Sequence, residues 1–325
     1  MAAEPAGSGP RALERPSRLS RIEIVANERS GSVGEGAAAE AQAIAEGLGY
    51  EVNARAIEPH DLIDCLKAAI ASKPDLLVVI AGDGTANAAA ELCGPDGPLL
   101  APLPGGTMNM LPHALYGRTD WKSALHAILS DGRVRLVAGG EVEGHAFTVA
   151  AILGDPALWA PAREALRSGN LGKAIGYARY AWRRTFSRKL RFTLDGAAHQ
   201  KAEALALMCP LVSKGVPDDT PALEAVAIDP KSFGGVLRLG LHALLSPLIG
   251  PALGGDWRSD PAVTPGQCRE GHAYARRHIN AILDGEPIRL PKFVTIRFKP
   301  VAFRALVPAT DPHQPPILMD GGIGL

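Results

Sequence analysis

The chain has 325 residues, of which 46% are hydrophobic and 21% are charged, a composition that excludes a disordered or fibrous protein. Its formal net charge is zero, so no nucleic acid partner is expected, and any electrostatic partner must bind a local patch. The four cysteines lie far apart without a C-x-x-C pair, which favours the reducing cytoplasm over a zinc site or a disulfide framework.

The amino-terminal part of the chain alternates predicted strands and helices. Residues 1–20 lack the apolar run of a signal peptide and are predicted to be a flexible tail. Arg21–Ala26 predicts the first strand, and the stretches at 50–57 and 75–81 predict two more, with a helix after each of the first two strands. This order favours a parallel sheet covered by helices, in which ligands bind at the carboxyl ends of the strands.

The second half has a different pattern. From about residue 133, short strands are separated by Gly, Asp and Pro, which predicts antiparallel sheet. We therefore expect an α/β protein with an amino-terminal parallel-sheet domain at 21–130 and a carboxyl-terminal antiparallel β-rich domain at 131–310. Residues 311–325 are expected to form a C-terminal segment that can return to the first domain.

A glycine-rich turn, "AGDGT", follows the buried strand predicted at 75–81. Gly82 and Gly84 free the backbone N–H groups to face a phosphate, and Thr85 can give a hydroxyl at the start of the next helix. Asp83 suits a metal ion or the proton of an attacking hydroxyl, both of which occur in phosphoryl transfer. Taken alone, the Asp-Gly pair also fits an ordinary β-turn.

Two further loops of similar composition also follow apolar strands, which favours a phosphate-binding site over an isolated β-turn. Two such loops at adjacent strand ends can form a single cleft. No Walker motif and no G-x-G-x-x-G occurs at these turns, which disfavours the common phosphate-loop families. The residues concerned are Asn27, Ser30 and Gly31 in the first loop and Gly106, Thr107 and Asn109 in "PLPGGTMNML".

In order and spacing these motifs resemble the diacylglycerol kinase and sphingosine kinase type of lipid kinases. That family has N-P-x-S-G after the first strand, then G-G-D-G-T, then P-x-G-T-x-N, and a late D-G-E that "AILDGEPI" matches here. The resemblance covers about residues 21–310. The chain departs from the pattern at Glu28, Ala81 and Ala88, where the family has proline, glycine and often glutamate.

The resemblance implies an ATP- and Mg²⁺-dependent lipid kinase, whose first domain binds the nucleotide and whose second domain holds a lipid hydroxyl. Asp83 and Glu286 are expected to organise Mg²⁺, and Asp284 is the expected base, although the resemblance also permits Asp83 in that role. Asp284 and its glycine equally fit a hairpin turn. The implied nucleotide-binding residues are Asn27, Ser30, Gly31, Gly82, Asp83, Gly84, Thr85, Gly106, Thr107 and Asn109.

Two segments suggest contact with lipid. Residues 171–186 predict a basic amphipathic helix, which either packs on the second domain or docks on an anionic membrane surface at the inner face of the membrane. The apolar stretch at 234–255 either packs in the core or lines an acyl-chain groove.

Two alternatives to a lipid kinase stay open. One is an NAD kinase, which has a related fold and also uses a G-G-D-G turn, although the P-x-G-T-x-N loop disfavours it. The other is a catalytically weak lipid- or nucleotide-binding protein, which Ala81 and Ala88 motivate. The identity of the lipid and the oligomeric state do not follow from the sequence.

Overall fold

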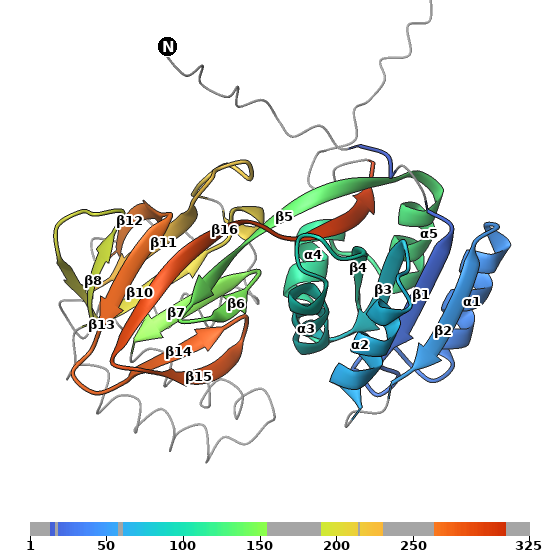
Figure 1. The fold of residues 1–325 in the computed structure, drawn as a ribbon, viewed down its shortest axis with the longest axis horizontal. Coiled ribbons are helices and arrows are strands. Elements are labelled where there is room, and N and C mark those ends of the chain that lie inside the picture. Colours follow the sequence, from blue (N-terminus) through green and yellow to red (C-terminus); the bar gives the residue numbers. More distant parts are fainter. Residues whose placement is uncertain are drawn as a thin grey trace, which may run out of the picture. The chain divides into compact units, whose positions relative to one another are not determined.

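The computed structural model describes residues 14–16, 19–57, 61–154, 190–213, 215–229 and 263–309. By their contacts, these residues form two compact units (Figure 1). The first, which we call the α/β unit, contains the described residues up to Leu136 together with those from Phe303 onward. The second, the β unit, contains the described residues between Val137 and Ala302.

Four parallel strands form the centre of the α/β unit: β1 (Arg21–Ala26), β2 (Glu51–Ala56), β3 (Leu76–Ala81) and β4 (Leu99–Pro104). Their order in the sheet is β2-β1-β3-β4. Every residue of β3 and β4 is buried, as expected for strands with both faces covered. The order makes β1, β3 and β4 consecutive, so the loops that follow them leave the sheet side by side.

Helices follow these strands and cover the sheet (Figure 1). The helix α3 begins two residues after β3 ends, so its amino terminus lies at the carboxyl edge of the strands. The predicted parallel sheet with covering helices is thus confirmed. The helices are α1 (Ala37–Gly47), α2 (Leu62–Ala71), α3 (Asp83–Cys93), α4 (Met110–Tyr116) and α5 (Trp121–Asp131).

The last residues of β16 (Phe293–Pro308) complete the sheet of the α/β unit. Ala305 pairs with Leu100 of β4 in parallel orientation. The buried hydroxyl of Tyr116 donates a hydrogen bond to the carbonyl oxygen of Leu306 at 3.1 Å, which attaches α4 to the same strand. The first residues of β16 belong to the β unit, where they pair with an antiparallel neighbour.

The β unit contains antiparallel strands, which confirms the predicted change of sheet type. One sheet has the order β12-β11-β10-β7-β14-β15, and β16-β13-β8-β9 continue the other, with a shared apolar core that includes Phe147, Phe192 and Ile296. Besides the first part of β16, the strands are β5 (Gly132–Val142), whose residues before Val137 belong to the α/β unit, β6 (His145–Phe147), β7 (Ala150–Gly154), β8 (Leu190–Leu194), β9 (Gln200–Ala202), β10 (Ala204–Met208), β11 (Leu223–Ile228), β12 (Val263–Cys268), β13 (Glu270–Tyr274), β14 (Ile279–Leu283) and β15 (Glu286–Leu290).

The predicted basic helix at 171–186 and the apolar stretch at 234–255 lie outside the described residues. Within the part of the chain that the structure describes, no helix is both long enough and apolar enough to cross a bilayer.

Candidate functional site

The loops after β1, β3 and β4 meet at the carboxyl edge of the parallel sheet. A Cβ added at Gly106 would lie 2.6 Å from the Cα of Gly82, closer than real side-chain atoms approach. A Cβ at Gly31 would lie 3.5 Å from Oγ1 of Thr107, and one at Gly82 would lie 3.3 Å from Oγ of Ser30. Close approach of the second and third loops therefore requires glycine at position 106.

Backbone hydrogen bonds hold the three loops together. The amide of Asn27 donates to the carbonyl oxygen of Ile80 at 2.9 Å, which joins the first loop to β3. The amide of Ser32 donates to the carbonyl oxygen of Gly105 at 3.2 Å, which joins the first loop to the third. The side-chain oxygen of Asn27 accepts from the amide of Arg29 at 3.3 Å. The loops thus form one preorganised surface of backbone and small polar side chains.

Asn109 shapes the third loop from within. Its backbone has a left-handed φ of 50°, which asparagine tolerates better than most residues. Its Oδ1 accepts a hydrogen bond from the amide of Gly106 at 2.7 Å, and its Nδ2 donates to the carbonyl oxygen of Gly106 at 2.9 Å. The buried amide of Asn109 is therefore engaged in holding the loop, and its direct contact with a nucleotide stays a prediction.

Asp83 is the first residue of α3 and is half-buried. Its Oδ1 accepts a hydrogen bond from the amide of Met110 at 2.6 Å, which joins the starts of α3 and α4. Its Oδ2 accepts none from any of the described residues. Gly84 is exposed beside it, and Thr85 is buried in the first turn of the helix. One carboxylate oxygen is therefore available to a cation or a proton at the carboxyl edge of the sheet.

Sequence reasoning missed His113, which lies in α4. Burial lowers the pKa of His113 below its ordinary value, the positive charge of Arg118 lowers it further, and the carboxylate of Asp83 opposes both. His113 is therefore near enough to Asp83 to interact with it electrostatically. Its position four residues after Asn109, one helical turn away, is a signal that could have found it.

Glu28, one of the departures from the family pattern, has a contact of its own. Its Oε1 accepts a hydrogen bond from the amide of Ala38 at 3.2 Å, in the first turn of α1. The N-cap residue of that helix, Gly36, has no side chain that could do this. A carboxylate near a helix amino terminus is stabilising. Glu28, which lies in the first loop, therefore caps the amino terminus of α1.

Asp284 lies in the β unit, in the turn between β14 and β15. Asp284 and Gly285 have φ values of 47° and 93°, as a tight hairpin turn requires. The Oδ2 atom accepts from the amide (2.7 Å) and hydroxyl (3.2 Å) of Thr148, and Oδ1 accepts from the amides of Val149 (2.9 Å) and Ala150 (2.8 Å). Burial raises the pKa of Asp284, and these hydrogen bonds oppose the rise. Both oxygens of Asp284 are thus already engaged.

A second hairpin repeats this conformation where no motif was recognised. Asp195 and Gly196, between β8 and β9, have φ values of 47° and 71°. The Oδ1 atom of Asp195 accepts from the amides of Arg269 and Glu270, both at 2.9 Å. An aspartate that binds the backbone of a neighbouring segment is therefore a recurrent feature of hairpins in this unit.

The structure brings together the ten residues predicted to bind the nucleotide, because all of them lie in the three loops or at the start of α3. Asp284 and Glu286 belong to the β unit, where Glu286 is the exposed first residue of β15.

A magnesium ion that arrives with a nucleotide fits the side chains present at the α/β site. Among the described residues, no three His, Cys, Asp or Glu side chains cluster as metal ligands. Mg²⁺ at nucleotide sites takes one or two carboxylates and completes its shell with phosphate oxygens and water. The free Oδ2 of Asp83, beside the glycine backbone, meets that requirement.

Residues 21–142 match the model of the diacylglycerol kinase catalytic domain. These residues belong to the diacylglycerol kinase catalytic domain family. The match runs from β1 to the end of β5 and includes all three loops. No curated protein matches the chain in sequence.

Solved structures resemble almost the whole chain. A diacylglycerol kinase from Bacillus anthracis strain Sterne is 18% identical, with a TM-score of 0.63 over 90% of this chain and 98% of that one. A candidate diacylglycerol kinase from the same strain is 17% identical, with a TM-score of 0.67 over the same shares. Yeast NADH kinase, solved with NADH, is 11% identical, with a TM-score of 0.50 over 91% of this chain and 86% of that one.

These structural likenesses establish the fold alone, which a diacylglycerol kinase and an NADH kinase share. The match of residues 21–142 to the diacylglycerol kinase catalytic domain in addition supports a phosphotransferase.

Proposed function

We propose that the protein transfers the γ-phosphate of ATP to a hydroxyl group of a diacylglycerol-like lipid. The observation that carries the proposal is the meeting of three loops of a diacylglycerol kinase domain around Gly82 and Gly106, beside a carboxylate oxygen without a partner among the described residues. Backbone amides at strand ends and helix starts can bind phosphate oxygens. Positioning and charge neutralisation account for most of the catalysis in phosphoryl transfer.

We assign Asp83 to the Mg²⁺-bound phosphates, because its Oδ2 is available and Met110 fixes its position. Mg²⁺ would neutralise negative charge on the phosphates there. Ser30 and Thr107, whose hydroxyls lie beside Gly82 and Gly31, would donate to phosphate oxygens. Asn27 and Asn109 would keep the first and third loops in shape.

The base that accepts the proton of the lipid hydroxyl is either Asp83 or Asp284, and their contacts favour Asp83. For Asp284 to accept a proton, it would have to release at least one of four hydrogen bonds. Asp83 can accept one on Oδ2 without breaking any contact to a described residue. We therefore propose that Asp284 positions the turn at 148–150 and that Glu286, which is exposed in the same hairpin, contacts the bound substrates.

The acceptor can be identified by offering labelled ATP and Mg²⁺ with a panel of lipid alcohols in neutral detergent micelles, and with NAD in a separate reaction. We expect a labelled phospholipid and no labelled NADP. Labelled NADP without labelled lipid would overturn the proposal. ATP binding without transfer to any acceptor would instead favour the catalytically weak binding protein.

Position 82 tests whether the glycine turn binds phosphate. Gly82→Asp places a negative charge beside Ser30 and is expected to weaken ATP binding at least about 100-fold, since a like charge set against the phosphates costs several kcal/mol. Gly82→Ala is the matched control, because it adds a Cβ without a charge and its nearest contact, at 3.3 Å, is with the side-chain oxygen of Ser30, which can shift. Isothermal titration of both variants with Mg-ATP measures the difference. Unchanged affinity in Gly82→Asp would contradict the phosphate-binding role.

A further inference from the structure

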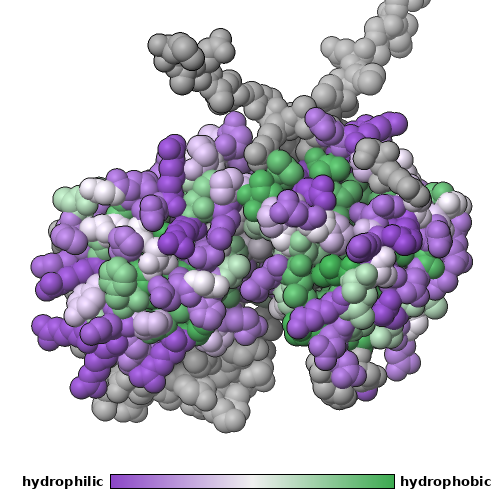
Figure 2. All heavy atoms as spheres, in the orientation of Figure 1, coloured by the Kyte–Doolittle hydropathy of each residue, from purple (hydrophilic) through white to green (hydrophobic). Residues whose placement is uncertain are grey.

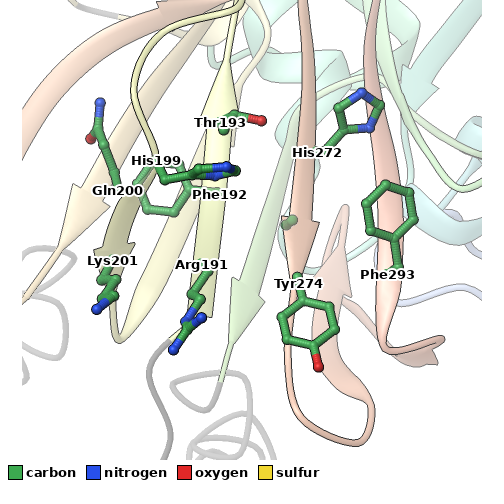
Figure 3. Close-up of a pocket in the computed structure, with 10 residues that line it drawn as sticks. Arg191, Phe192, Thr193, His199, Gln200, Lys201, His272, Tyr274 and Phe293 are labelled. Atoms are coloured by element: carbon green, nitrogen blue, oxygen red, sulfur yellow. The ribbon is translucent and has the colours of Figure 1, made fainter.

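Four exposed side chains form a row across one face of the β unit, shown in Figure 3. Strand pairing places Lys201 opposite Arg191, Arg191 opposite Tyr274, and Tyr274 opposite Phe293. Residues paired in this way point to the same face of a sheet. Tyr274 is 41% exposed and Phe293 is 49% exposed, so the row presents two cations followed by two aromatic rings to the solvent.

A shallow hollow of about 300 Å³ lies along this row. His272 stacks on Phe293 with 5.3 Å between the ring centroids, which fixes the position of the outer ring. Figure 2 shows hydrophilic and hydrophobic residues side by side on the surface of this unit. The rings of Tyr274 and Phe293 are therefore held on the surface rather than packed into the core.

The strand segments that carry the row contain basic residues and no acidic ones, and the carboxylate of Glu143 accepts a hydrogen bond nearby from the amide of Thr295 in β16. The segments 190–193, 199–201, 272–277 and 291–293 contain no Asp or Glu. The amide of Ala275 donates to the carbonyl oxygen of Lys292 at 2.8 Å, which holds the last two of these segments together. None of their cations has an ion-pair partner within the described parts of the chain. These cations are Arg191, Lys201, Arg276, Arg277 and Lys292.

We propose that this basic aromatic row is the surface by which the protein docks on an anionic lipid bilayer. Aromatic rings are favoured at the interface between headgroups and acyl chains, and lysine and arginine are attracted to anionic headgroups. A free phosphate would use the cations of the row but not its rings. This inference rests on the proposed function, because only a kinase that acts on a lipid needs to reach the membrane that contains the lipid.

Cations beside aromatic rings also suit single-stranded nucleic acid, but the charge of the chain favours a bilayer. The chain as a whole has a formal net charge of zero, whereas nucleic-acid-binding domains are commonly basic overall. The family of residues 21–142 points to a lipid acceptor. The bilayer is therefore the occupant to which we commit, and nucleic acid becomes an outcome of the test.

The test is sedimentation of the full chain, without nucleotide, with vesicles of phosphatidylcholine alone or with about one third phosphatidylglycerol. We expect binding to the anionic vesicles that weakens with added salt. Arg191→Gln/Lys201→Gln should lower the partition coefficient about 25-fold, at about fivefold for each cation, and Arg191→Glu/Lys201→Glu should lower it further. Tyr274→Ala/Phe293→Ala should lower it at least about tenfold while keeping the salt dependence.

The matched control reverses two exposed cations that do not belong to the row, as Lys67→Glu/Arg269→Glu. It makes the same change in net charge as Arg191→Glu/Lys201→Glu, and we expect it to leave vesicle binding within about twofold of wild type. Equal binding by the control and the row variant would overturn the proposal. Binding of single-stranded DNA that exceeds vesicle binding and is lost in the row variants would also overturn it.

Failure of this inference is distinguishable from failure of the proposed kinase activity. Vesicle binding is measured without ATP, whereas lipid phosphorylation can be measured in neutral detergent micelles that need no docking. The row variants are expected to keep wild-type turnover in micelles and to lose it selectively on anionic vesicles. Loss in both assays, with unchanged vesicle binding, would contradict the docking role.

Discussion

The dipeptide Asp-Gly occurs in both motifs proposed for catalysis, as Asp83-Gly84 in the α/β unit and as Asp284-Gly285 in the β unit. Asp83 starts a helix, uses one oxygen to hold the next helix start, and keeps the other oxygen free of the described residues. Asp284 has a left-handed backbone conformation and engages both oxygens with the turn at 148–150. The same dipeptide thus has a carboxylate oxygen free of the described residues in the α/β unit, and a fully hydrogen-bonded carboxylate in the β unit.

This difference shows that a motif match does not by itself assign a chemical role. A carboxylate that accepts several backbone hydrogen bonds stabilises the structure that provides them, and those bonds must be broken before the group can do anything else. Asp195 makes the point independently, because it has the same turn conformation without belonging to any motif. Of the four predictions below, the first three test the contrast between Asp83 and Asp284.

The largest expected effect is on turnover at Asp83. Asp83→Asn keeps an oxygen for the amide of Met110 but removes the charge that would meet Mg²⁺ and the proton. We expect turnover to fall at least about 100-fold, with a weakened dependence on Mg²⁺. Steady-state phosphorylation rates over a Mg²⁺ series measure both effects, with the exposed Asp96→Asn as control. Normal turnover in Asp83→Asn would remove the basis of the contrast.

A smaller effect is expected on stability at Asp284. Asp284→Asn replaces one acceptor oxygen by an amide donor, which leaves at least one N–H of the turn unsatisfied and destabilises the fold by about 1–3 kcal/mol. Asp195→Asn keeps the single oxygen that Asp195 uses, so it should change the unfolding free energy by less than about 0.5 kcal/mol. Urea unfolding of the two variants measures the difference.

The variant Asp284→Asn also distinguishes a base from a positioning residue. If Asp284 only positions its turn, Asp284→Asn should lower turnover in proportion to its loss of folded protein and leave the shape of the pH–rate profile unchanged. Loss of the acidic limb of that profile, where the rate rises as the base loses its proton, in a fully folded Asp284→Asn protein would show that Asp284 is the base, and our assignment to Asp83 would be wrong.

The smallest expected effect is at His113, whose folded pKa is lowered by burial and by Arg118. A lowered pKa gives stability that is present above the ordinary value of about 6.5 and lost as the pH falls through the lowered value. Wild type should therefore lose more unfolding free energy than His113→Gln between about pH 7.5 and 5, by less than about 1 kcal/mol. The exposed His126→Gln is the control, and an equal pH dependence in wild type and His113→Gln would contradict the prediction.

Much of the fold could be predicted from the sequence, because local patterns determine it. The alternation in Arg21–Ala26 and the apolar run of β3 gave the parallel strands, and the Gly- and Asp-punctuated second half gave the antiparallel sheets. The sequence does not predict that β16 pairs with β13 at its start and with β4 near its end, because its sixteen residues form a single strand stretch. Its pairing with β4 is a long-range contact that no local pattern encodes.

The candidate site was predictable in its location but not in its details. The glycines at 82 and 106 and their place after strands indicated where the loops converge. The engagement of Asn109 with Gly106, and of Asp284 with the turn at 148–150, depends on three-dimensional contacts that the motifs do not specify. The basic aromatic row could not be predicted for the same reason, since its four residues are adjacent only once the strands are paired in register.

The shared strand β16 also determines when the α/β unit can finish folding. Leu100 and Ala305 are partners in the sheet although about two hundred residues separate them along the chain. On the ribosome, β4 is made early but must wait for almost all of the rest of the chain before its outer neighbour exists, and closing so long a loop is slow. A fragment that stops at residue 142 would leave β4 with an unpaired edge, and such edges invite aggregation.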